Sequence, residues 1–93
     1  MIVKSSFILV GEPEGFGYKF FSKILSRFDL TLDVVDTTKE GFYDEFRDVV
    51  KQCSESRFEK ILIFDIEYNG MREYAANAGV IWYDYSEILK RLI

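Results

Sequence analysis

The sequence contains no histidine, so the side chain that most often acts as a general base or zinc ligand is missing. Acid–base chemistry would therefore fall to carboxylates, lysine or tyrosine. Cys53 is the single cysteine, which excludes an intramolecular disulfide and a thiolate metal cluster. Because Cys53 falls on the apolar stripe of a helical pattern, we expect a buried, inert thiol.

Long hydrophobic runs are also missing, since no apolar run exceeds five residues and a membrane span needs about 20. The start, Met1–Ser6, lacks the basic and then apolar layout of a signal peptide. We therefore expect a cytoplasmic protein without a membrane partner. The net charge of −4 disfavours nucleic acid as a partner without excluding it. Asn and Gln together number three, which is typical of a thermophilic source.

Four apolar segments have the length and pattern of strands. Two are continuous, as in strands buried on both faces, and one alternates between apolar and polar residues, as in a half-exposed strand. A fourth is rich in aromatic residues. In chain order the predicted strands are Phe7–Val10, Leu30–Val34, Lys60–Ile66 and Val80–Tyr83.

Helical periodicity fills the segments between and after these strands. The first helix is predicted over about Gly15–Phe28. The second follows Thr37–Glu40, whose pattern is that of a capping box. The third begins near Met71 and has Gly79 at the position of a C-terminal cap, and Ser86 caps the fourth.

Strand and helix alternate four times in one domain spanning residues 1–93, which predicts a mostly parallel sheet with helices on both faces. The continuous strands belong in the centre and the alternating one at an edge. Numbered along the chain, the order 2-1-3-4 satisfies both conditions. The expected fold is a three-layer α/β sandwich that resembles flavodoxin-like and Rossmann-like domains in outline.

Acidic residues follow the two central strands. In open α/β sheets, ligands bind beyond the carboxyl ends of the strands, where the strand order reverses. The predicted order places this point between the first and third strands. Carboxylates gathered there suit Mg²⁺, which takes one or two of them and keeps several waters. The candidate metal ligands are Glu12, Glu14, Asp65 and Glu67.

A simpler interpretation explains the same acids, because Asp and Glu favour the beginnings of helices. Glu14-Gly15 and Asp65-Ile66-Glu67 also resemble the layout of Toprim catalytic domains, which cut or join nucleic acids with magnesium. The resemblance implies a Mg²⁺-dependent phosphoryl-transfer or nucleic-acid-cleaving enzyme. The second acid of the pair is Glu where the family has Asp, and the two motifs cover under a tenth of the chain.

The first loop, Gly11–Gly17, contains three glycines and the single proline. It has neither the Walker nor the dinucleotide-binding spacing, and its two glutamates would repel a phosphate. We therefore attribute the glycines to turn formation. The helix after this loop carries Lys19, Lys23 and Arg27 at intervals of four, which is typical of a solvated face. The alternative is a docking surface for an acidic partner or a nucleic-acid backbone.

The last strand combines an edge position with aromatic residues. Exposed edges must be paired or protected, and Trp and Tyr are favoured interface residues. We therefore expect a homo-oligomer or a protein partner at this strand, bound through Trp82, Tyr83 and Tyr85. In the alternative, Trp82 packs beneath the last helix and the two tyrosines flank it. The favoured function is a non-enzymatic interaction or regulatory module that self-associates through this strand.

Overall fold

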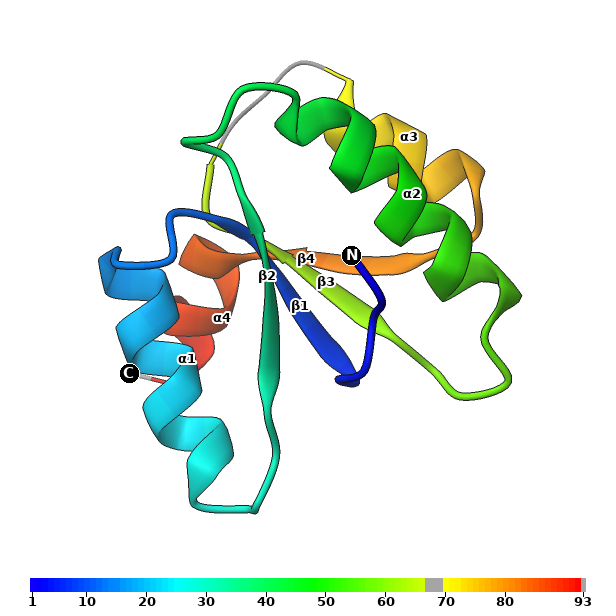
Figure 1. Cartoon of the computed structure of the whole chain (residues 1–93). Helices are drawn as coiled ribbons and strands as arrows, with labels where there is room; N and C mark the ends of the chain where they lie inside the picture. Colours follow the sequence, from blue (N-terminus) through cyan, green and yellow to red (C-terminus); the bar gives the residue numbers. More distant parts are fainter. Residues whose placement is uncertain (67–69, 93) are drawn as a thin grey trace.

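A computed structural model describes residues 1–66 and 70–92, which form a four-stranded parallel sheet with helices on both faces (Figure 1). The strand order is β2-β1-β3-β4, so the predicted order and the α/β fold class are confirmed. The elements are β1 Phe7–Gly11, α1 Phe16–Ser26, β2 Leu32–Asp36, α2 Phe42–Glu55, β3 Ile61–Phe64, α3 Met71–Asn77, β4 Ile81–Asp84 and α4 Tyr85–Leu92.

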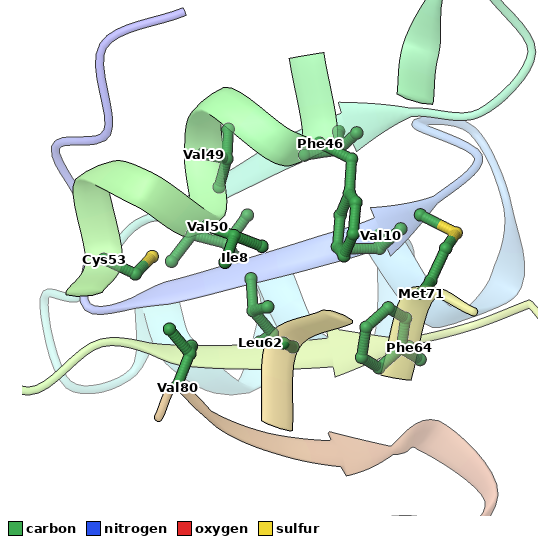
Figure 2. Packing of buried hydrophobic residues seen from close by; sticks show 12 residues of the cluster. Ile8, Val10, Phe46, Val49, Val50, Cys53, Leu62, Phe64, Met71 and Val80 are labelled. Atoms are coloured by element: carbon green, nitrogen blue, oxygen red, sulfur yellow. The ribbon is translucent and has the colours of Figure 1, made fainter. Parts of the chain in front are cut away.

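The continuous apolar runs are central because each must bury both of its faces. In β1, Ile8 and Val10 face α2 and α3, and Leu9 faces α1 and α4. Figure 2 shows the first side, where Phe46 of α2 and Met71 of α3 pack over the strands. All five of these side chains are almost completely buried. The sheet is therefore the middle of three layers, as Figure 1 also shows.

Helices α1 and α4 cover the other face of the sheet less completely. Leu9, Ile63 and Phe21 form the buried centre of this side. The eight residues of α4 contribute Tyr85 and Ile88, which are only half-buried. The incomplete cover leaves an apolar groove between α1 and α4.

The predicted capping box at Thr37–Glu40 is wrong. Thr38 instead donates from its backbone N–H and its hydroxyl to Asp36 Oδ1, at 2.9 and 2.6 Å. Those hydrogen bonds hold the pKa of Asp36 below its usual value. Helix α2 begins later, after Gly41, which has a φ of 78° and no side-chain cap. A local turn closed by Asp36 therefore competes successfully with an earlier helix start.

Two helices end in left-handed residues. At the end of α3, Gly79 has a φ of 75°, and the N–H groups of Gly79 and Val80 donate to the carbonyls of Ala76 and Ala75. This is a Schellman motif, and it confirms Gly79 as the predicted cap. The same pair of hydrogen bonds follows α1, where Asp29 takes the left-handed position with a φ of 57°.

Cys53 is 8% exposed on the inner face of α2, as expected, and burial raises the pKa of its thiol. Within residues 1–66 and 70–92, no helix is long and apolar enough to cross a membrane.

Candidate functional site

Strands β1 and β3 are neighbours, and their carboxyl ends lie together at the point where the strand order reverses. Gly11 is the last residue of β1, and Asp65 follows β3 directly. The Asp65 N–H donates to the Val10 carbonyl at 3.0 Å, which extends the ladder between the strands by one bond. Asp65 is therefore fixed at the position where open α/β sheets bind ligands.

Three glycines of the first loop surround the Asp65 side chain. A Cβ atom added at Gly17 would lie 2.7 Å from Asp65 Oδ2, and one at Gly11 would lie 2.8 Å from Asp65 Cβ. At Gly15 an added Cβ would lie 3.8 Å from Oδ2. None of the three has a positive φ. Gly11 and Gly17 are therefore explained by close packing against Asp65, where turn formation was expected.

The turn itself is formed as predicted. The Gly15 N–H donates to the Glu12 carbonyl at 3.1 Å, with Pro13 at the second position of the turn. Proline second and glycine fourth are favoured in a type I turn. The turn brings the amino end of α1 against Asp65, so the loop and the acid form one unit.

The environment of Asp65 raises the pKa of its carboxyl. Partial burial raises the pKa of this carboxyl, and the nearby charge of Glu12 raises it further. The pKa of the Tyr85 hydroxyl is also raised, mainly by burial and in part by the nearby charge of Asp65. In the described part of the chain this hydroxyl is buried and has no hydrogen-bond partner. A cation near Asp65 and Glu12 would offset the repulsion between their charges.

The predicted metal ligands are only partly gathered. Glu12 lies close enough to Asp65 to influence the pKa of its carboxyl, Glu14 is exposed in the turn, and Glu67 lies outside the described residues. Among the residues that the structure describes, no three acidic or thiol side chains are grouped so as to hold a metal ion. The magnesium site stays a prediction that rests on Glu12 and Asp65.

An ion pair that sequence reasoning missed lies beside Asp65. Arg72 of α3 pairs with Asp84 at the end of β4, and Arg72 Nε donates to Asp84 Oδ1 at 2.7 Å. A pocket of about 140 Å³ is lined by this pair together with Asp65, Tyr85 and Ser86. An acid at the carboxyl end of a fourth parallel strand was a visible signal for Asp84. The sequence had no comparable signal for Arg72.

The aromatic residues of the last strand divide into packed and exposed groups. Trp82 lies edge-on to Phe64 at 5.9 Å, with the Arg72 guanidinium 6.0 Å from its ring. Tyr85 packs between α1 and the sheet, in ring contact with residues Phe16, Phe20 and Phe21. Trp82 therefore packs beside α3, where the alternative expectation placed it beneath the last helix. Tyr83 is 40% exposed and is the predicted partner-binding aromatic residue with the most accessible surface.

The predicted basic residues Lys19, Lys23 and Arg27 are all exposed along α1 and at its end. Helix α1 contains no acidic residue. These three residues therefore form a solvated cationic face of α1. Both a simple solvated surface and a docking surface would have this property.

Comparison of this chain with protein-family models, with curated proteins and with solved structures finds no match.

Proposed function

We propose that this chain is a non-enzymatic interaction module that self-associates through strand β4. The observation that carries the proposal is the exposed apolar edge of the sheet. Ile81 and Tyr83 lie on one face of β4 and are 39% and 40% exposed. Strand β4 pairs with β3 on one side and lies last in the sheet order. Such an edge presents backbone hydrogen-bonding groups to any second strand.

The two edges of the sheet differ in how they are protected. Strand β2 carries two acids, and Asp33 accepts hydrogen bonds from the backbone N–H groups of Lys4 and Ser5 at 2.8 and 2.9 Å. The acid at this position of β2 is therefore tied to the segment before β1, and charge still marks the strand. The single acid of β4 is Asp84, and Arg72 already neutralises it. Charge is a common defence against edge pairing, so β4 is the less defended edge.

A two-fold axis beside Trp82 would pair β4 with its copy in antiparallel orientation. Ile81 of one copy would then face Tyr83 of the partner subunit, and the reverse pair would form across the axis. Cross-strand pairs of an aromatic and a β-branched residue each contribute roughly 0.2–1 kcal/mol. A strand of four residues buries less area than the roughly 1,200–2,000 Å² of standard interfaces, so the dimer should be weak and reversible.

Sedimentation velocity across micromolar concentrations tests the proposal. We expect a concentration-dependent monomer–dimer equilibrium for the wild type. Tyr83→Lys should leave a monomer, because a charge on the edge strand opposes pairing. Ile2→Lys is the matched control, since Ile2 is also apolar and is 76% exposed far from β4 in sequence. A wild type that stays monomeric throughout, or equal loss of dimer in both variants, would contradict the proposal.

A second candidate function, magnesium-dependent phosphoryl transfer, is favoured by the charge of Glu12 acting on Asp65 at the point where the strand order reverses. Two carboxylates about 4 Å apart repel by roughly 4 kcal/mol at an effective dielectric of 20, and a divalent cation relieves that repulsion. Titration with Mg²⁺ or Mn²⁺ should then shift or broaden the amide resonances of residues 11–15 and 65. Glu12→Gln should abolish the change and Glu45→Gln, on α2, should not. Unchanged resonances in the wild type would remove this candidate.

A further inference from the structure

A groove of about 360 Å³ lies between α1 and α4 on the sheet. Its floor is formed by Phe7, Ile61 and Ile63, from the two central strands. Tyr83 of β4 closes one side, and the two helices form the walls. The remaining lining residues are Phe21, Ile24, Leu25, Glu87, Ile88 and Arg91.

The groove is too large to be a packing defect. Protein interiors leave few voids larger than a water molecule, and parallel sheets are normally covered on both faces. Pockets for small molecules have volumes of roughly 300–1,000 Å³ and mostly apolar walls with a few polar groups. This groove meets both criteria. Its lining favours a ligand with a flexible apolar body.

The charges around the groove are unevenly distributed. The whole chain has a net charge of −4, yet α1 contains no acid. Both helices follow parallel strands and return along the same face, so their carboxyl ends lie on the same side of the domain (Figure 1). Exposed cations stand at these two ends, with Lys23 and Arg27 from α1 and Lys90 and Arg91 from α4.

One of these cations lines the groove, and a second follows a lining residue at helical spacing. Arg91 lines the groove directly. Arg27 lies three positions after Ile24, another lining residue, and residues at this spacing share a helix face. Glu87 also lines the groove, one helical turn before Arg91. It would repel a negative group from the part of the groove that it lines. The favoured position for a negative group is therefore the end of the groove near Arg91.

We propose that this groove binds a free fatty carboxylate. The alkyl chain lies on Phe7, Ile61 and Ile63, and the carboxylate lies against Arg91 and Arg27. Burial of the chain supplies most of the affinity, at roughly 25 cal/mol per Å² of apolar surface. The two guanidinium groups select the anionic head, since Arg suits carboxylate geometry. This site is separate from the Asp65 pocket and does not depend on self-association.

Titration of the protein with decanoate, decanol and decylamine, followed by amide resonances, tests the proposal. The three probes share their chain and differ in head charge. We expect decanoate to shift the amides of Phe21, Ile24, Ile63 and Ile88, and to bind about tenfold more tightly than decanol and more tightly still than decylamine. Equal affinity for decanoate and decanol, or shifts confined to residues outside the groove, would overturn the proposal.

Charge-reversal variants provide an independent measurement. The double variant Arg27→Glu with Arg91→Glu should weaken decanoate binding about tenfold or more and change decanol binding by less than about twofold. Arg47→Glu with Lys51→Glu, on α2, is the matched control and should leave decanoate binding unchanged. If a second copy covers the groove, the same amides will shift with protein concentration alone and decanoate will not bind to the dimer. That result would also overturn the proposal.

Discussion

The Asp65 carboxylate lies directly against the backbone of Gly17, so closely that a Cβ atom at Gly17 would stand 2.7 Å from Oδ2. Gly17 is the second residue of α1, and Asp65 follows β3. The contact therefore joins the first helix to the centre of the sheet. It also makes the glycine and the acid depend on each other, which can be measured.

Gly17→Ala should destabilise the protein by about 1 kcal/mol, since overpacking a close contact costs roughly 1–3 kcal/mol and the carboxylate can move aside in part. In an Asp65→Ala background the same substitution should instead stabilise by about 0.5 kcal/mol, because alanine is the better helix former. Urea unfolding of the four proteins in this double-mutant cycle measures the coupling.

Gly11→Ala is the control for that cycle. Its added Cβ would lie 2.8 Å from Asp65 Cβ, an atom that Asp65→Ala retains. We therefore expect a loss of about 2–3 kcal/mol in both backgrounds. Equal rescue of the two glycine variants by Asp65→Ala would contradict this account of the contacts.

The pH dependence of stability should report on Asp65. Burial raises the pKa of this carboxyl above its ordinary value of 3.8, with a further contribution from Glu12. Between the unfolded and folded pKa values the native state holds more protons, so stability falls as pH rises through that window. Asp65→Asn should therefore be more stable than the wild type at neutral pH. The difference should shrink as pH falls through the raised pKa towards the ordinary value of 3.8.

Asp36 supplies a comparison of opposite sign. The pKa of Asp36 is lowered, chiefly by its hydrogen bonds from Thr38. Its contribution to stability is present above the unfolded pKa and is lost as pH falls through the folded pKa. Asp36→Asn should destabilise at neutral pH, with the effect fading in acid. Thermal unfolding of Asp65→Asn and Asp36→Asn across this pH range measures whether each variant is more or less stable than the wild type. A change in the same direction for both variants would contradict the opposite pKa shifts of the two carboxyls.

Asp29→Gly should stabilise the protein. Asp29 holds the left-handed position after α1 with a φ of 57°, where a side chain costs roughly 1–2 kcal/mol and glycine is favoured. Since glycine also gains freedom in the unfolded chain, we expect a net gain of about 0.5–1 kcal/mol. That corresponds to a rise in Tm of about 4 °C.

Gly79→Ala is the reverse test of the same principle. Gly79 has a φ of 75°, and an added Cβ would have no neighbour within 4 Å. Any loss of stability therefore comes from backbone strain alone. We expect about 1 kcal/mol, and an unchanged Tm would show that the left-handed position is not required.

Phe46→Ala should cost about 3–5 kcal/mol, the usual range for removing a buried phenylalanine. Phe46 has no exposed surface, and its ring lies 5.9 Å from that of Phe64. Phe58→Ala is the matched control, because Phe58 is 76% exposed and should change stability by less than about 0.5 kcal/mol. Denaturant unfolding separates the two.

The strand order could be predicted because a strand buried on both faces has an uninterrupted run of apolar residues in the sequence. Uninterrupted apolar residues at Phe7–Val10 and Ile61–Phe64 required central positions, and the structure places both there. Helix boundaries were less readable, since they depend on competition between local hydrogen bonds. The predicted capping residue, Thr37, lies before the start of α2, and its neighbour Thr38 completes a turn with Asp36.

The candidate site was only partly predictable for a different reason. The sequence pattern showed that acids follow adjacent strands, so an electrostatic effect of Glu12 on Asp65 was to be expected. The packing of Gly11 and Gly17 on Asp65 depends on tertiary distances that no spacing in the sequence encodes. The pairing of Arg72 with Asp84 likewise joins a helix and a strand whose separation is set by the fold.

Amide hydrogen exchange at the two sheet edges tests self-association through β4 most directly. Exchange in residues 81–84 should slow as protein concentration rises, because pairing with a second copy protects the outward N–H groups. Exchange in residues 32–36 of β2 should not change, which makes the opposite edge an internal control. Protection of β4 that is independent of concentration, or a change of equal size at β2, would contradict the account.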